Sequence, residues 1–274
     1  MNRLTWTSVL LALCLVLFLP LDGNARKKNA RGRHATGGPA LVIEPDKMVV
    51  PAVQEKYVAR VESLSGQESS HKQVNTKYRE GIDVSHYQGT IDWDAVAGSS
   101  QISYAYLKAT EGASLVDDTY KRNLQEARRV GLSVGSYHFY RPNIDWREQL
   151  KNLTTNVDAD TQDLVPIIDI EHRGHVSESK FIKDLKDFVQ AVEKHYGKKP
   201  LLYSYQNFYN RHLKDLFTDY HWMIAKYKSD QPVLEDGKQF IIWQYTSKGR
   251  IPGVKGNVDR SRLMGDFTLR QLVL

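Results

Sequence analysis

Short apolar runs alternate with helical patterns along residues 81–274. Eight runs rich in β-branched and aromatic residues predict strands. These runs are residues 81–84, 102–107, 133–139, 165–170, 201–204, 222–225, 240–244 and 257–259. Helical spacing of apolar residues marks five segments between them: residues 92–97, 119–130, 146–157, 180–195 and 208–213. Gly131 and Gly197 follow two of these segments, where glycine commonly ends a helix.

This alternation of strands and helices predicts an α/β fold with a parallel sheet. About eight strands suit a closed barrel, and fewer helices than strands means that some helices are reduced or missing. We therefore expect an irregular (β/α) barrel of the TIM type. In such barrels the catalytic groups lie at the C-terminal ends of the strands.

Two acidic residues follow the most apolar of the predicted strands. Leu164 to Ile168 lead directly into Asp169-Ile170-Glu171. Side chains alternate along a strand, so Asp169 and Glu171 should face the same way, roughly 6–7 Å apart at the backbone. Each carboxylate raises the pKa of the other, which suits one of them to act as an acid, as glycoside hydrolysis requires. The alternative interpretation is a pair of solvated or ion-paired acids at a strand end.

Polar and aromatic residues also end most of the other predicted strands. They are Asp83, Lys108 with Glu111, Tyr137 with His138 and Phe139, Tyr203 with Tyr205, Trp243 with Gln244, and Asp259. A barrel would bring these ends to one rim. We therefore expect four acids, Asp83, Asp169, Glu171 and Asp259, beside an aromatic wall.

The N-terminal residues have the pattern of a secretory signal peptide. A short positive region at Arg3 precedes an apolar core over residues 9–19, and Gly23-Asn24-Ala25 fits a cleavage site. We expect residues 1–25 to be removed near Ala25 and the protein to be exported, to a periplasm, cell envelope or exterior. An uncleaved anchor is the alternative, although the apolar core is short for a membrane span.

Composition changes this picture in two ways. The only cysteine, Cys14, lies in the predicted signal peptide, so the mature chain has no disulfide. The net charge of +6 is concentrated in residues 26–34, which carry +5 and leave +1 for residues 35–274. A folded basic face for nucleic acid is therefore not expected. Residues 26–80 are predicted to form a basic and then polar linker, largely disordered, before a catalytic domain at 81–274.

Six motifs in this order resemble those of the family 25 glycoside hydrolases, which are lysozymes (N-acetylmuramidases). The motifs are residues 81–89 (GIDVSHYQG), 106–112 (YLKATEG), 135–139 (GSYHF), 169–171 (DIE), 243–245 (WQY) and 258–259 (VD). The resemblance covers residues 81 to about 267. It implies an irregular β/α barrel that cleaves the β-1,4 bond between N-acetylmuramic acid and N-acetylglucosamine in peptidoglycan. It implies no metal and no cofactor, and peptidoglycan glycan strands as the partner; we expect a monomer.

Carried over by motif, the resemblance makes Glu171 the general acid, with Asp169, Asp83 and Asp259 completing the acidic cluster. Glu171 can protonate the leaving oxygen, and Asp169, kept anionic, would raise the pKa of Glu171. The second role stays open between attack by the 2-acetamido group of the substrate, direct attack by an aspartate and activation of water. We favour the substrate-assisted route, with retention.

The expected substrate-binding residues are aromatic or polar side chains at the same strand ends. They are Tyr137, Phe139, Tyr205, Trp243 and Gln244. Structural roles are expected for His86 and His138, and an ion pair for Lys108 and Glu111. Two other functions are compatible with the sequence: a wall-binding module without catalysis, and a hydrolase of another N-acetylated glycan such as chitin.

Overall fold

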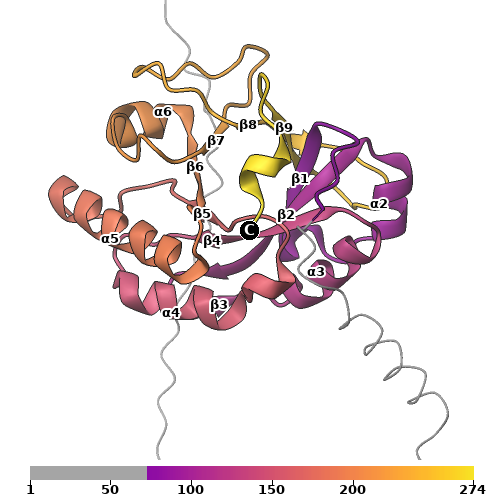
Figure 1. Cartoon of the computed structure of the whole chain (residues 1–274), viewed down its shortest axis with the longest axis horizontal. Helices are drawn as coiled ribbons and strands as arrows, with labels where there is room; N and C mark the ends of the chain where they lie inside the picture. The colour runs from indigo at the N-terminus through magenta and orange to yellow at the C-terminus, as the bar shows by residue number, and fades with distance from the viewer. Residues whose placement is uncertain (1–72) are drawn as a thin grey trace, which may run out of the picture. The chain divides into compact units, whose positions relative to one another are not determined.

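A computed structural model describes residues 73–274, which fold around a single β-sheet that closes on itself (Figure 1). Within these residues there are nine strands. They are β1 (Glu80–Val84), β2 (Ile102–Glu111), β3 (Leu115–Val116), β4 (Ser133–Phe139), β5 (Ile167–Asp169), β6 (Leu201–Tyr205), β7 (Trp222–Ala225), β8 (Ile242–Gly249) and β9 (Val258–Leu263). The sheet order is β1-β9-β8-β7-β6-β5-β4-β2-β3, and β1 also pairs with β2. Eight strands therefore form a closed barrel, and β3 is a short hairpin arm on β2.

Helices cover the barrel unevenly. The elements are α2 (Trp93–Ser99), α3 (Tyr120–Arg129), α4 (Trp146–Asn156), α5 (Glu178–Tyr196), the short α6 (Gln206–Phe208), the π-helical turn η3 (Tyr209–Leu213), and the 3-10 turns η1 (His86–Gln88), η2 (Ala159–Thr161) and η4 (Leu269–Leu272). No helix connects β7 to β8 or β8 to β9 within residues 73–274. The expectation of an irregular TIM-type barrel with reduced helices is confirmed.

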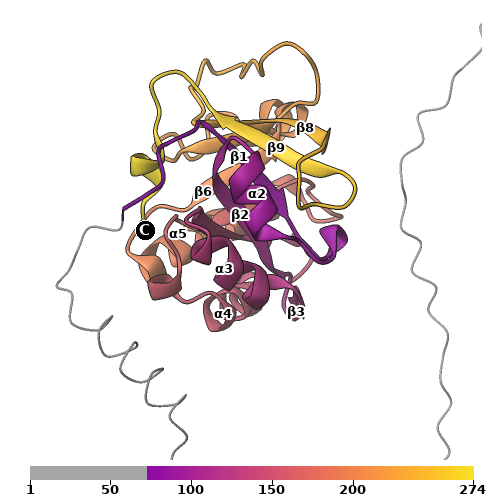
Figure 2. The same cartoon turned by 90° about the vertical axis from the view of Figure 1, so that its right-hand side faces the viewer.

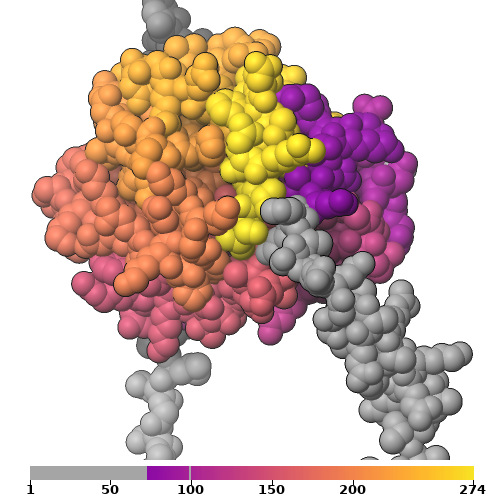
Figure 3. Space-filling model, in the orientation of Figure 1, coloured from indigo at the N-terminus to yellow at the C-terminus, as the bar shows by residue number. Residues whose placement is uncertain are grey.

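The last strand differs from the predicted parallel order. The strands from β1 through β2, β4, β5, β6, β7 and β8 pair in parallel, whereas β9 pairs antiparallel with both β8 and β1. Figure 2 shows β9 alongside β1 and β8, and Figure 3 shows the yellow C-terminal surface between the orange and indigo surfaces. The chain thus closes its barrel by returning along β8, because a short connection suffices for antiparallel strands.

The strand before Asp169 is shorter than predicted. Pro166 has no N–H to donate to a ladder, and β5 begins one residue later at Ile167. Leu164 and Val165 instead pair with the C-terminal residues, since the Val165 N–H donates to the Leu272 carbonyl at 2.8 Å. Glu171 consequently lies two residues beyond the strand.

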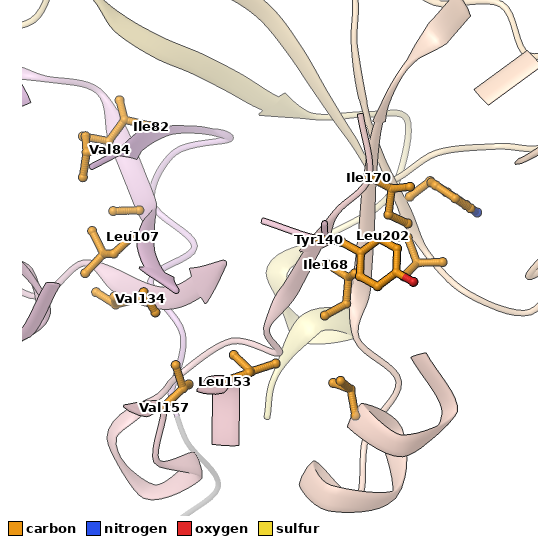
Figure 4. Packing of buried hydrophobic residues seen from close by; sticks show 14 of the residues in the cluster. Ile82, Val84, Leu107, Val134, Tyr140, Leu153, Val157, Ile168, Ile170 and Leu202 are labelled. Carbon is orange, nitrogen blue, oxygen red and sulfur yellow. The ribbon is translucent and has the colours of Figure 1, made fainter. Parts of the chain in front are cut away.

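The main core lies between the barrel and its helices. Figure 4 shows Ile82, Leu107, Val134 and Ile168 of the strands in this layer, together with Leu153 of α4. All five side chains are buried, and burying each one contributes roughly 1.5–3 kcal/mol. This packing fixes the outward-facing residues, so their sequence neighbours are held inside the barrel.

Large rings fill the barrel interior. Tyr104 and Tyr106 of β2 are fully buried there, and each occupies the space opposite a glycine. A Cβ atom on Gly81 would lie 2.2 Å from the Tyr104 ring, and one on Gly135 would lie 2.3 Å from the Tyr106 ring. The two glycines of the predicted strands therefore make room for the interior packing.

The domain starts earlier than residue 81. The Asn75 N–H donates to Ser133 Oγ and the Tyr78 N–H to Ser103 Oγ, both at 2.7 Å. The Arg79 guanidinium donates to the Leu263 carbonyl at 3.1 Å. These bonds tie the segment before β1 to the barrel, which extends the expected catalytic domain toward the N-terminus. The predicted signal peptide and most of the predicted linker, residues 26–72, lie outside the described residues.

Candidate active site

The C-terminal ends of the barrel strands enclose a cavity of about 190 Å³. Fourteen residues line it: Asp83, Tyr87, Lys108, Tyr137, Phe139, Ile167, Asp169, Glu171, Tyr203, Tyr205, Met223, Tyr227, Gln244 and Asp259. All four acids expected at the rim are among them. The barrel therefore brings together carboxyl groups that lie up to 176 positions apart in the sequence.

Strand register places the acids. Asp83 on β1 lies directly opposite Asp259 on the antiparallel β9. Asp169 ends β5, where it is aligned with Phe139 of β4 and Tyr203 of β6. Adjacent strands in register present their side chains on the same face. The acids thus come from β1, β5 and β9 into one cavity.

Glu171 keeps the alternation of β5 although the strand has ended. The Ile170 N–H donates to the Tyr203 carbonyl at 2.9 Å, and Ser204 Oγ donates to the Ile170 carbonyl at 2.7 Å. Ile170 is buried in the main core, whereas Asp169 and Glu171 both line the cavity. The prediction that these two side chains face the same side is confirmed.

Burial dominates the electrostatics of this pair. Burial first, and then the charge of Asp259, raise the pKa of Glu171 to about 7. Burial raises the pKa of Asp169 well above its usual range, followed by the charge of Glu171. Neither side chain has an ion-pair partner among residues 73–274. Two interacting buried carboxyls titrate together, and both shifts favour the protonated forms. That Asp169 is the anionic partner of Glu171 stays a prediction.

The other two acids are also shifted toward their neutral forms. Burial raises the pKa of Asp83 to about 8, while a hydrogen bond from Gln244 acts in the opposite direction. Burial raises the pKa of Asp259 to about 6. Asp83 Oδ1 and Asp169 Oδ1 are buried and accept no hydrogen bond within the described part of the chain. Unsatisfied buried carboxyl oxygens of this kind cluster at functional sites.

A cationic group borders the acids on one side. Lys108 Nζ lies 2.5 Å from Glu111 Oε2, and Arg141 Nε donates to Glu111 Oε1 at 2.9 Å. The predicted pairing of Lys108 with Glu111 is confirmed, but sequence reasoning missed Arg141. Both cations also lie near the Phe139 ring, at 5.6 Å and 4.6 Å from its centroid. Phe139 thus lines the cavity while its ring contacts the cationic groups of Lys108 and Arg141.

Four of the five expected substrate-binding residues line the cavity: Tyr137, Phe139, Tyr205 and Gln244. The fifth, Trp243, does not. Gln244 faces the cavity, so Trp243 faces outward on β8, where its Nε1 donates to the Lys226 carbonyl at 3.0 Å. Trp243 is 1% exposed and lies under the Arg262 guanidinium. Strand alternation itself excludes Trp243 and Gln244 from sharing one face.

Three further tyrosines line the cavity that were not among the expected substrate-binding residues. Tyr203 lies two residues before Tyr205 on β6, and Tyr227 lies two residues beyond the end of β7. Tyr203 was expected at the rim beside Tyr205, and the alternation rule that joined Asp169 to Glu171 would also have found Tyr227. Tyr87 lies in the turn η1 and is 77% exposed at the cavity lip. A turn carries no periodic signal, so Tyr87 was not predictable in this way.

The two histidines take structural positions outside the cavity lining. His138 is fully buried between Thr110 Oγ1 at 2.8 Å and Gln149 Oε1 at 3.2 Å. Burial lowers the pKa of His138 to about 4, which keeps it neutral. His86 Nδ1 lies 2.8 Å from Asp117 Oδ2 and so braces the turn η1.

Comparison with known proteins decides the family. A family model described as glycosyl hydrolases family 25 matches residues 82–254, which include every strand from β2 to β8 and most of β1. This chain belongs to glycosyl hydrolases family 25. It is therefore a glycoside hydrolase of the lysozyme type, and the resemblance seen in the sequence is confirmed.

Three relatives illustrate the similarity. Protein YegX of Escherichia coli K12, itself uncharacterized, is 37% identical over 183 residues, covering 65% of this chain and 67% of the relative. Lysozyme M1 of Streptomyces globisporus is 31% identical over 250 residues, covering 82% of each chain. A family 25 glycosyl hydrolase from Bacillus anthracis, solved as a structure, has a TM-score of 0.64 at 29% identity, with 73% of this chain and 96% of that chain covered.

Proposed function

We propose that this protein hydrolyses the β-1,4 bond between N-acetylmuramic acid and N-acetylglucosamine in peptidoglycan. The observation that carries the proposal is the pair Asp169 and Glu171, buried side by side in an aromatic-walled cavity without a cation bound to either. Such a pair can hold a proton at neutral pH and release it to a leaving group. Membership of a lysozyme family supports the choice of peptidoglycan as substrate.

In this proposal Glu171 is the general acid. Its proton passes to the glycosidic oxygen as the bond to the anomeric carbon breaks. When Glu171 carries the proton of the pair, Asp169 is ionised, and it can then accept a hydrogen bond. A pKa of about 7 for Glu171 keeps a large fraction of this side chain protonated at neutral pH.

The second half of the reaction is assigned to the substrate. The carbonyl oxygen of the 2-acetamido group attacks the anomeric carbon, while Asp169 accepts a hydrogen bond from the acetamido N–H. Water then opens the cyclic intermediate and gives its proton to ionised Glu171, so the configuration is retained. A substrate lacking the N-acetyl group should not be turned over. Normal turnover of that substrate would exclude this route and leave attack by an aspartate or by activated water.

The remaining cavity residues are proposed to hold the sugar. Tyr137, Phe139 and Tyr205 are half-buried and can contact sugar faces or the acetamido methyl group. Asp83 and Asp259 are proposed to complete the acidic cluster around the reacting centre. Gln244 contacts Asp83, which limits its freedom to bind substrate.

Export is also proposed, on the sequence of residues 1–25. We infer that this signal peptide is removed near Ala25 and that the barrel acts on the cell wall outside the cytoplasm. Residues 73–274 include no helix that is long and apolar enough to span a membrane.

The test is mass analysis of the fragments that the protein releases from purified peptidoglycan. N-acetylmuramic acid at the new reducing ends is the expected result. Reducing-end N-acetylglucosamine would refute the assigned bond, and bound but uncleaved walls would indicate a binding module. A parallel incubation with chitin should release no fragments, because the proposal assigns muramic acid to the cleaved site.

A further inference from the structure

Gln244 lies at the centre of a buried hydrogen-bond network in the cavity. Its side chain is on β8, inside the barrel, and is 4% exposed. The hydroxyl groups of Tyr203 and Tyr227 donate to Gln244 Oε1 at 2.9 Å and 2.7 Å. Gln244 Nε2 donates to Asp83 Oδ2 at 3.0 Å. The network therefore runs from two tyrosines through one amide to one acid.

This arrangement determines which way the amide points. A carbonyl oxygen has two lone pairs, and the two phenol groups occupy both. In the orientation found, both phenols donate to Oε1 and Nε2 donates to Asp83, whereas the opposite orientation would turn Oε1 toward the Asp83 carboxyl group. In this arrangement Gln244 donates to Asp83.

The amide in turn determines which oxygen of Asp83 can carry a proton. Oδ2 accepts a hydrogen bond from the Gln244 N–H, so a proton on Oδ2 would point at another hydrogen-bond donor. Oδ1 is buried and has no partner among the described residues, and Asp83 lines the cavity. A neutral Asp83 thus has its O–H group at Oδ1.

We propose that Gln244, fixed by Tyr203 and Tyr227, is a positioning residue that directs the proton of neutral Asp83 to Oδ1, so that Asp83 donates a hydrogen bond to an oxygen of the bound sugar. The inference deepens the proposed function and rests on it. It assigns Asp83 a role different from those of Glu171 and Asp169, because a donor stabilises the substrate without giving up its proton.

The groups around Asp83 favour its neutral form. Asp259 faces it from β9, and the Asp169–Glu171 pair lies in the same cavity beyond β5. The charge of an ionised Asp83 also raises the pKa of three tyrosines, Tyr104 and Tyr106 of β2 and Tyr137 of β4. The only cation lining the described cavity is Lys108, which is paired with Glu111. Burial with Asp259 opposite raises the pKa of Asp83 to about 8, which agrees with a neutral group at pH 7.

The first test compares Asp83→Asn with Asp83→Ala in kcat/KM on soluble peptidoglycan fragments from pH 5 to pH 9. An asparagine can accept from Gln244 with its oxygen and donate to the sugar with its NH₂ group. We expect Asp83→Asn to retain at least about a tenth of the activity and Asp83→Ala to lose about 100-fold, the usual cost of removing a donor in an active site. Equal losses in both variants would overturn the inference, since a carboxylate would then be required.

The second test concerns the two tyrosines. Either phenol alone keeps Oε1 occupied, so Tyr203→Phe and Tyr227→Phe should each reduce kcat/KM about fivefold or less. The double variant frees the amide to rotate and should lose about 100-fold, more than the product of the single effects. If the double variant lost only the product of the two single losses in kcat/KM, the two phenols would not act together to hold the Gln244 amide in one orientation. Tyr245→Phe is the matched control: it removes a phenol bonded to Glu80 from the outer face of the same strand, and its kcat/KM should be unchanged.

The protonation state of Asp83 can also be measured independently of catalysis. The carboxyl carbon of Asp83, followed by NMR with pH, should report a protonated group at pH 7 in the wild-type protein. An ionised Asp83 at pH 7 would overturn the inference whatever the activity. Conversely, a protonated Asp83 in a protein that fails to cleave peptidoglycan would refute the proposed function and leave the Gln244 arrangement in place.

Discussion

Two glutamates lie at strand ends on the same barrel rim, and their surroundings differ sharply. Glu111 ends β2 and contacts Lys108 and Arg141. Glu171 follows β5 and has no ion-pair partner within residues 73–274. Although burial acts to raise the pKa of Glu111, hydrogen bonds from the two cations hold it below its ordinary value. The pKa of Glu171 instead rises to about 7.

Position at a strand end does not by itself make an acid catalytic. Both glutamates lie at the C-terminal ends of barrel strands, and both are partly buried. They differ in their cationic partners, because Lys108 and Arg141 both donate hydrogen bonds to Glu111. Neutralised cations near the cavity leave the Asp169–Glu171 pair able to hold a proton. In the proposed mechanism Glu111 therefore contributes indirectly, by occupying Lys108 and Arg141.

The largest expected effect separates the two glutamates by activity. Glu171→Gln removes the proposed proton donor and keeps its shape, so kcat/KM on peptidoglycan should fall by about 10³-fold or more. Loss of turbidity of a wall suspension measures this, and binding to the walls should persist. Glu148→Gln, on the exposed face of α4, is the control and should retain full activity. A fully active Glu171→Gln variant would remove Glu171 from the mechanism.

A smaller effect concerns stability. Asp83 has a raised pKa of about 8 in the folded protein and an ordinary value near 4 when unfolded. Between these values the folded state holds a proton that the unfolded state has released, so the free energy of unfolding falls as pH rises. Between pH 5 and pH 8 we expect Asp83 to lower it by about 2–4 kcal/mol. Asp83→Asn should flatten this dependence in urea unfolding measurements; an unchanged slope would mean that Asp83 is ionised in the folded protein.

Much of this site was predictable because alternation and strand ends are local properties of the sequence. Four acids at the rim were expected from apolar runs ending in acids, and all four line the cavity: Asp83, Asp169, Glu171 and Asp259. Trp243 was assigned to the cavity by its motif, against the alternation that places Gln244 there.

Other features depend on contacts between distant segments. Arg141 reaches Glu111 from the loop after β4, and nothing in the spacing of these residues predicts the contact. The antiparallel direction of β9 is likewise set by its pairing with both β8 and β1. A strand pattern reports which face is buried but not the direction of the partner strand.

The smallest effect tests whether Glu111 acts through its cations. Glu111→Gln removes a negative charge that raises the pKa of Glu171, and it leaves Lys108 and Arg141, which lower that pKa, without their partner. The pKa of Glu171 should therefore fall by up to about one unit, equivalent to about 1.4 kcal/mol. The alkaline decline of kcat/KM should move to lower pH by this amount, with up to about tenfold less activity at pH 8 and near-normal activity at pH 5. Glu126→Gln breaks a comparable ion pair with Arg129 on the exposed surface of α3 and should leave the profile in place. If both variants gave the wild-type profile, Glu111 would be a brace for the rim and the contrast between the two glutamates would carry no catalytic meaning.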